Sequence, residues 1–188
     1  MSSRDIWSRA GSLQVRDLLA SLLSSRLLME PGGDPLYVSA PYLTDFPVFD
    51  NAFGQFQPLF QSRPEFGEQE RILFSQALIE LSSRAPVRLI GVSGPNALPF
   101  IYATLRGNAP NISARLASQL HHEKGLLCPV FYLEGSMNFT YNGVYNRDEK
   151  ISVYTSDTPQ GSQKIGAATL EFNRLWEKLA TSELSRTP

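Results

Sequence analysis

The chain has 188 residues, which suits one domain and is too short for two ordinary ones. Hydrophobic residues make up 42% and charged residues 19%, which excludes a disordered chain and allows a core without disulfides or a structural metal. The formal net charge is −1 and the sequence pI is about 6.1. A broadly basic surface that coats nucleic acid is therefore excluded, whereas a local basic site is not.

The first predicted helix spans residues 12–28, where leucines recur at helical spacing. Ser12 is its expected N-cap, and Pro31-Gly32-Gly33 follows its end. Residues 36–40 form a short apolar run that is closed by Pro41, which is typical of a buried strand.

The next stretch, residues 42–67, is predicted to be an irregular, aromatic-rich loop. A structureless loop of that length is uncommon in a compact domain and usually has a function. Its phenylalanines could pack as a small satellite core or could line an interface or a site, and the sequence leaves both alternatives open.

The remaining elements begin with alternating helices and strands and continue with several strands before the last helix. They are a helix over 68–83, a strand over 87–94, a helix over 96–105, a strand over 111–118, a hairpin of 125–130 and 131–137, a strand over 150–156 and a helix over 164–179. Pro129 is expected at the turn or edge of the hairpin. This alternation predicts a single α/β domain with a partly parallel sheet.

The sequence carries few residues for metal or thiol chemistry. Cys128 is the single cysteine, so no intramolecular disulfide can form, the cytoplasm is the expected compartment, and the side chain is expected to be an apolar filler. His121 and His122 are the two histidines, which excludes a zinc site built from several histidines or cysteines. No apolar run approaches the roughly 20 residues that span a bilayer, and the first residues do not resemble a signal peptide.

The chemically informative residues lie in one segment, 121–149. His122 and Lys124 are two residues apart and would share one face of a strand, and Ser136 and Asn138 have the same spacing. A histidine can act as a nucleophile or a general acid, while an ammonium, a hydroxyl and an amide can hold a phosphate. Each fragment is a weak signal alone, but their order on neighbouring strands predicts a phosphate site.

These motifs resemble the signature of the phospholipase D superfamily, H-x-K-x4-D followed by G-S-x-N and a later acidic segment. The matching residues are HEK at 122–124, GSMNFT at 135–140 and NRDE at 146–149. The resemblance implies one phospholipase D-like domain over 1–188, with a central mixed β-sheet flanked by helices on both faces. VSAPYLTDFPVFDN at 38–51 is also similar to a Ser-Pro-Trp-(Ile/Leu)-(Ser/Thr)-Asp segment of small single-motif members from bacterial defence and DNA-modification gene clusters.

By resemblance, His122 attacks the phosphorus and forms a phosphohistidine. Lys124 and Asn138 would hold the non-bridging oxygens, with support from Ser136. His121 is out of register with Lys124 and is expected to be structural.

The carboxylate that orients the catalytic histidine has two candidates. Asp148 matches the N-x-acid spacing, whereas Glu149 fits the alternation of the strand that follows and is favoured. Asp45 and Asp50 could in principle join these two carboxylates at a divalent ion, but these four residues show no D-x-D or H-x-E pattern. The resemblance therefore implies a metal-independent reaction with no cofactor.

The chain departs from the superfamily pattern at Pro129, which occupies the position of the motif aspartate. The distance from Lys124 to Gly135 is also one residue shorter than usual. In the superfamily that aspartate lies near the hairpin turn and is not the nucleophile, so its loss affects local geometry more than chemistry. A catalytically inactive binding or assembly subunit is the alternative that this departure favours.

The resemblance implies a nuclease that acts on DNA rather than RNA, in a bacterial defence setting. A lipid phosphodiesterase is disfavoured because no basic amphipathic helix, lipidation signal or membrane anchor is visible. Because the chain has one motif and the reaction needs two histidines, we expect a homodimer. Local basic residues are few, so a helicase or translocase partner is expected to deliver the DNA; they are Arg115, Lys124, Arg147 and Lys150.

Overall fold

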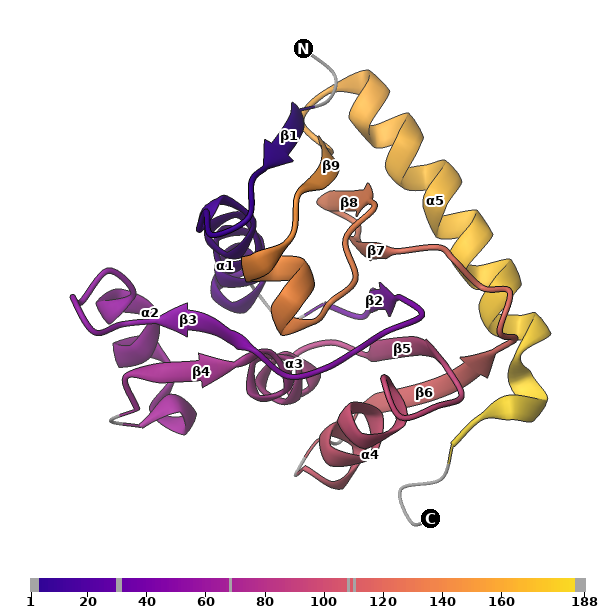
Figure 1. Ribbon diagram of the computed structural model, residues 1–188, viewed down its shortest axis with the longest axis horizontal. Coiled ribbons are helices and arrows are strands. Elements are labelled where there is room, and N and C mark those ends of the chain that lie inside the picture. The colour runs from indigo at the N-terminus through magenta and orange to yellow at the C-terminus, as the bar shows by residue number, and fades with distance from the viewer. Residues whose placement is uncertain (1–3, 30–31, 68, 108, 110, 185–188) are drawn as a thin grey trace.

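A seven-stranded mixed sheet lies at the centre of the molecule (Figure 1). The computed structural model describes residues 4–29, 32–67, 69–107, 109 and 111–184. The strands, in the order in which they lie in the sheet, are β1 (Arg4–Ser8), β9 (Glu149–Thr155), β8 (Phe131–Gly135), β7 (Gly125–Cys128), β2 (Leu36–Ser39), β5 (Val87–Val92) and β6 (Ile112–Ala117). Strands β2, β5 and β6 run parallel to one another, and the other neighbours pair antiparallel.

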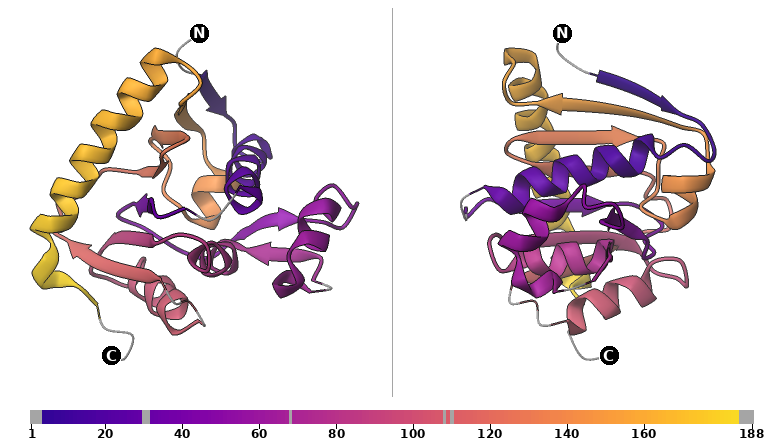
Figure 2. Two further views of the ribbon diagram at one scale, coloured as in Figure 1. Left: turned by 180° about the vertical axis from the view of Figure 1, so that it is seen from behind. Right: turned by 90° about the vertical axis from the view of Figure 1, so that its left-hand side faces the viewer.

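Helices cover both faces of this sheet (Figure 2). Helices α1 (Gln14–Leu28), α3 (Phe74–Ser82) and α4 (Leu98–Arg106) pack on one face, and the long α5 (Pro159–Lys178) packs on the other. Adjacent strand residues divide between the two cores: Leu126 belongs to the first and Leu127 to the second. Because successive side chains point to opposite faces, a strand buried on both sides reads as a continuous apolar run. The fold class predicted from the sequence is therefore confirmed.

Residues 42–67 are not the structureless loop that the sequence predicted. They contain β3 (Pro47–Asp50), α2 (Gln57–Ser62) and a short 3-10 helix, η1 (Pro64–Phe66). Strand β3 pairs antiparallel with β4 (Arg71–Leu73) as a separate two-stranded sheet. Most of the phenylalanines are buried in the first core, which favours the packing alternative; these are Phe46, Phe49, Phe60 and Phe66.

The structure differs from the sequence prediction at three further places. Strand β1 was not predicted, because its five residues show no alternation of apolar and polar side chains. Helix α1 begins at Gln14 without a side-chain cap, and the buried Ser12 hydroxyl has no hydrogen-bond partner among the described residues, so Ser12 is not the N-cap. The helix predicted over 68–83 begins only at Phe74, since β4 occupies the preceding residues.

The other elements were predicted correctly to within a few residues. Strands β2, β5, β6 and β9 and helix α4 fall on the expected ranges, and Pro129 lies in the turn between β7 and β8. Helix α5 begins at Pro159, five residues before the predicted start at Lys164. Within the described ranges, no helix combines the length and the hydropathy that crossing a bilayer requires.

Phe74 is the centre of an aromatic stack in the first core. It is fully buried, and its ring lies 5.0 Å from Phe46, 5.8 Å from Phe100 and 5.6 Å from Phe139. We expect Phe74→Ala to lower the free energy of unfolding by about 3–5 kcal/mol, because it leaves a cavity among three rings. Urea denaturation measures this loss. Phe53, which is 95% exposed, provides the control: Phe53→Ala should change stability little, and equal losses would contradict the assignment of Phe74 to the core.

Candidate active site

The residues of the H-x-K and G-S-x-N motifs approach one another where β7, β8 and β9 lie side by side. His122 and Lys124 precede β7, Ser136 follows β8, and Glu149 is the first residue of β9. A depression of about 480 Å³ is lined by His122, Lys124 and Ser136, together with Glu123, Tyr132, Glu134, Gly135, Lys150 and Ser152. We call it the histidine depression. Three of the four residues that were expected to contact phosphate therefore line one surface.

His122 and Lys124 are not inside a strand, as their spacing had suggested. Residues 121–124 form an irregular segment, and β7 starts at Gly125. The Lys124 ammonium donates a hydrogen bond of 2.9 Å to the main-chain carbonyl of His122. His122 is exposed and Lys124 half-buried, so both remain open to a ligand.

Ser136 and Glu149 are joined directly. The Ser136 hydroxyl donates to Oε2 of Glu149, and the main-chain N–H of Lys150 donates to the same hydroxyl oxygen at 3.1 Å. The Ser136 N–H in turn donates to the Lys150 carbonyl at 3.0 Å. Glu149 is only 7% exposed, so Ser136 supplies the hydrogen bond that a buried carboxylate requires.

Gly135 makes this close approach sterically feasible. Its φ is +157°, and a Cβ at this position would collide with the Lys150 carbonyl oxygen. A larger residue at this point would therefore separate β8 from β9 beside the Ser136–Glu149 contact.

Asp148, the alternative carboxylate, has a different hydrogen-bond partner. Its Oδ1 accepts a hydrogen bond of 2.7 Å from the N–H of Ala10, which lies between β1 and α1. Of the two candidates, Glu149 is the one that contacts a residue of the G-S-x-N motif.

Asn138 lies outside the histidine depression. It lines a neighbouring depression of about 320 Å³, and its Oδ1 accepts a hydrogen bond of 3.3 Å from the Tyr42 N–H. The chain beyond β8 crosses the segment that follows β2, where Leu43 and Phe139 form an isolated parallel bridge. The expected grouping of Asn138 with His122 in one depression is therefore not observed.

His121 points toward the end of β2. Its Nε2 lies 2.8 Å from the hydroxyl of Ser39, which is fully buried. Burial lowers the pKa of His121, an effect that Glu123 opposes and Lys124 reinforces. This contact agrees with the structural position expected for His121.

The other acidic candidates have structural partners. Asp45 accepts hydrogen bonds from the N–H and hydroxyl of Ser75 at the start of α3, and Asp50 pairs with Arg71 at 3.2 Å. Across the described parts of the chain, no three His, Cys, Asp or Glu side chains are grouped so that they could hold a metal ion. Cys128 is buried, and burial raises its thiol pKa, as expected for an apolar filler.

The predicted basic residues divide between several places. Lys124 and Lys150 line the histidine depression, and Arg147 lines the depression that contains Asn138. Arg115 pairs with Glu183 at 2.7 Å and lies over the ring of Trp176, so it does not contribute to the site.

Sequence reasoning missed Trp7, which is 70% exposed and whose ring lies 5.1 Å from the Lys150 ammonium. The antiparallel pairing of β1 with β9 places Trp7 opposite Lys150. Since β1 itself carries no periodic signal, the sequence gave no indication of this neighbour.

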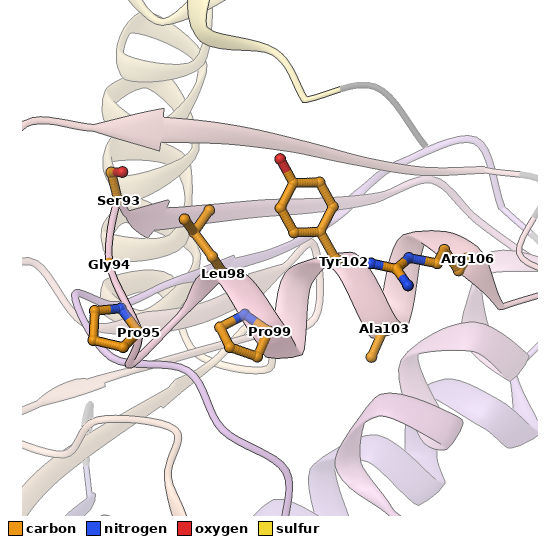
Figure 3. Close-up of a pocket in the computed structure, with 8 residues that line it drawn as sticks. All are labelled: Ser93, Gly94, Pro95, Leu98, Pro99, Tyr102, Ala103 and Arg106. Carbon is orange, nitrogen blue, oxygen red and sulfur yellow. The ribbon is translucent and has the colours of Figure 1, made fainter. Parts of the chain in front are cut away.

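A further depression, of about 520 Å³, lies along α4 (Figure 3). Its lining is mostly apolar, and Arg106, its single cation, lies over the ring of Tyr102 at 5.8 Å. It contains none of the residues of the two motifs.

We expect the buried His121 to make the fold sensitive to acid. Because its folded-state pKa is lowered, the unfolded chain binds more protons between that pKa and the ordinary value of about 6.5. This contribution to stability is present above about pH 6.5 and is lost as the pH falls through that window. The substitution His121→Asn should reduce the fall in Tm between pH 7.5 and pH 5.

The same substitution at the exposed His122 is the matched control and should leave the fall in Tm in place. Identical pH profiles for the two variants would contradict the proposed origin of the acid sensitivity.

No protein-family model matches the chain, and no curated protein gives a significant match. Solved structures do share its fold. Nuc from Salmonella typhimurium, described as a phospholipase D family member, has 16% identity and a TM-score of 0.58, covering 97% of this chain and 96% of its own. NucT from Helicobacter pylori has 15% identity and a TM-score of 0.57, covering 97% of this chain and 99% of its own.

A third structure with this fold is TrmBL2, described as an archaeal chromatin protein with a novel mode of DNA binding. It has 10% identity and a TM-score of 0.50, and the match covers 95% of this chain and 53% of TrmBL2. The first two matches cover nearly the whole of this chain and of each neighbour. The chain therefore shares the fold of these two structures, and this is the fold that the motif resemblance implied.

Proposed function

We propose that the chain is a phosphodiesterase, a nuclease that cleaves DNA with His122 as its nucleophile. The observation that carries the proposal is the histidine depression, where His122, Lys124 and Ser136 meet on a phospholipase D-type fold. Glu149 is buried and accepts a hydrogen bond from Ser136, so four of the five proposed site residues lie at this place and Asn138 lies apart.

The proposed reaction has two steps. An imidazole nitrogen of His122 bonds to phosphorus while the bond from phosphorus to one ester oxygen breaks, and a second histidine protonates that oxygen. Water then attacks the phosphohistidine, restores the imidazole and releases the phosphate monoester. Splitting the displacement in this way replaces one difficult step with two easier ones.

Lys124 and Asn138 are the proposed phosphate ligands, and Ser136, whose hydroxyl donates to Glu149, supports them. The Lys124 ammonium opposes the charge that develops on the non-bridging oxygens. Asn138 Oδ1 accepts the Tyr42 N–H, which leaves the amide N–H₂ of Asn138 to donate to phosphate. Bringing Asn138 to the same phosphate as His122 requires the ligand to bridge the two depressions.

Glu149 is proposed to act as a positioning residue. Its carboxylate accepts a hydrogen bond from the Ser136 hydroxyl, so it fixes the segment that carries Ser136 and Asn138. The reaction as proposed needs no metal, because a histidine supplies the nucleophile and a lysine supplies the positive charge.

The biological setting is proposed from the resemblance. Residues 38–51 and 135–146 are similar to segments of small phospholipase D-like proteins of bacterial defence gene clusters, and a cytoplasmic location fits the buried free thiol of Cys128. The described basic residues at the site are few, which supports weak affinity for bare DNA and delivery by a helicase or translocase.

A second candidate function is that of a catalytically inactive DNA-binding or assembly subunit. Pro129 in place of the motif aspartate and the separate position of Asn138 favour it. TrmBL2, whose description is that of a DNA-binding chromatin protein, shows that this fold also occurs in a protein of that kind.

A cleavage panel tests the enzymatic proposal. Single-stranded DNA, duplex DNA, RNA and a phospholipid are incubated with the chain in excess chelator. We expect cleavage of DNA, and a loss of at least about 1,000-fold in kcat for His122→Ala because the nucleophile is removed. His121→Asn is the control histidine variant and should retain activity.

Each other outcome of the panel is informative. Activity that disappears with chelator would contradict the metal-independent mechanism, and full activity of His122→Ala would exclude this nucleophile. Preferential cleavage of the phospholipid would replace DNA with a lipid substrate. Binding of DNA without cleavage would favour the inactive subunit.

Assembly is proposed to complete the site. The reaction needs a second histidine, and the His121 ring of the same chain is held at Ser39, so a second copy must supply it. We propose a twofold symmetric homodimer in which two His122 side chains face one phosphate, with the GSMN segments at the axis. Such an interface should bury at least about 1,000 Å².

Subunit mixing tests this assembly. If wild-type and His122→Ala chains exchange freely, activity should fall with the square of the wild-type fraction, because mixed dimers lack one of the two histidines. The pH profile should be bell-shaped, since one imidazole must be neutral and the other protonated. A linear fall in activity, or full activity from a demonstrated monomer, would rule out the shared site.

A further inference from the structure

The depression that contains Asn138 has the composition of a binding site for a nucleotide. Three segments that are distant in sequence form it: the residues after β2, the loop before α4 and the chain between β8 and β9. We call it the tyrosine depression; the residues that matter for its proposed role are Tyr42, Asn96, Asn138, Tyr141, Asn142 and Arg147.

Its aromatic surface is accessible and well supported. Tyr42 is 48% exposed and Tyr141 is 49% exposed. The Tyr141 ring stacks on Tyr145 with centroids 4.7 Å apart and an interplanar angle of 18°, and the Tyr145 hydroxyl donates to the Pro47 carbonyl at 2.6 Å. A half-exposed ring that is backed by a fixed ring is suited to stacking against a flat ligand.

The polar groups of the depression suit the rest of a nucleotide. Asn142 accepts a hydrogen bond from Asn146 through Oδ1, so its N–H₂ group can donate to a base. Asn96 is exposed, and its position is fixed because its carbonyl accepts the Leu43 N–H at 2.8 Å. Amide side chains of this kind recognise the edges of bases.

The charge of the depression favours an anion. Arg147 is exposed, and no described residue accepts a side-chain hydrogen bond from its guanidinium or forms an ion pair with it. The described residues that line the depression include no carboxylate, whereas the histidine depression contains Glu123 and Glu134. A free guanidinium without a competing carboxylate is a ready ligand for phosphate.

The two depressions are linked through the G-S-x-N motif. Ser136 lines the histidine depression and Asn138 lines the tyrosine depression, and two residues of extended chain span at most about 7 Å. A polynucleotide whose scissile phosphate lies at Ser136 therefore passes Asn138 with an adjoining nucleotide.

We propose that the tyrosine depression binds an unpaired nucleotide beside the scissile phosphate, which makes single-stranded nucleic acid the substrate class. The base of this nucleotide stacks on Tyr42 or Tyr141 and forms hydrogen bonds with the asparagine amides. Arg147 contacts a flanking phosphate. A base inside a duplex is covered on both faces by its neighbours and cannot stack on a protein ring without leaving the helix. The choice of substrate rests on the proposed nuclease function, whereas the binding site can be tested without cleavage.

The test measures binding in a His122→Ala background, which prevents cleavage. A fluorescently labelled oligothymidine and an abasic oligonucleotide with the same phosphates are titrated, and anisotropy gives Kd. We expect Tyr42→Ala and Tyr141→Ala each to weaken binding of the oligothymidine by about 5- to 150-fold, the range of base stacking. The abasic oligonucleotide should bind weakly and lose less than about 2-fold in these variants.

Arg147→Gln provides an independent measurement of the phosphate contact. It should weaken both oligonucleotides and reduce the slope of log K against log salt concentration by about 0.7, the value for one phosphate on a single strand. Tyr102→Ala and Arg106→Gln, in the depression along α4 (Figure 3), are matched controls of the same residue types and should change Kd by less than about 2-fold.

The outcomes separate this inference from the proposed function. If binding depends on the tyrosines but the wild-type chain cleaves no nucleic acid, the site stands and the nuclease proposal fails. If the wild-type chain cleaves DNA while the tyrosine variants bind single strands as tightly as their parent, the nuclease stands and this site is wrong. Absence of measurable binding to the oligothymidine, or tighter binding to a duplex, would also overturn the inference.

Discussion

The buried carboxylate of Glu149 needs a hydrogen-bond donor, and the Ser136 hydroxyl meets that need at the point where β8 ends and β9 begins. An unpartnered carboxylate in this position would be costly, so the contact determines how closely the two strands approach. Gly135 permits the approach because it has no side chain to collide with the Lys150 carbonyl. The chain that leaves β8 is consequently directed across the end of β2, and both depressions are formed along its path.

The elements with strong local signals were predictable from the sequence. Helix α5 has a regular apolar stripe, and β5 is a mostly apolar run, interrupted by Arg88, between turn residues, so each was located without knowledge of its partners. Strands β1, β3 and β4 were not, because short strands without alternation form only through pairing with distant residues. The same distinction applies to the site. Spacing and alternation favoured Glu149, whereas the separate position of Asn138 depends on the long-range contact between Leu43 and Phe139, which no local pattern encodes.

Fold and chemistry are separate levels of inference in this molecule. The match to Nuc and NucT extends over nearly the whole chain at 15–16% identity, and the same architecture recurs in a protein described as a component of chromatin. A few side chains at the site distinguish a nuclease from a binding protein with the same fold. In this chain the side chains proposed for such a role occupy two surfaces of different charge: the described residues that line one include carboxylates, and those that line the other do not. A near-neutral protein can in this way keep a small cationic surface without a basic exterior.

The pairing of β1 with β9 has a consequence for the order in which the molecule is made. The parallel strands β2, β5 and β6, with α1, α3 and α4, are all encoded before residue 118, so they can associate while the ribosome is still adding the rest. Strand β1 precedes all of these strands in the sequence, but its strand partner, β9, is synthesised after them. The entropic cost of closing the long loop between β1 and β9 grows only with the logarithm of its length. The time that passes between the synthesis of the two strands therefore matters more for their pairing than this cost. Because Glu149 belongs to β9, Ser136 gains this partner only after β9 is synthesised, and the candidate site is incomplete until β9 pairs with β8.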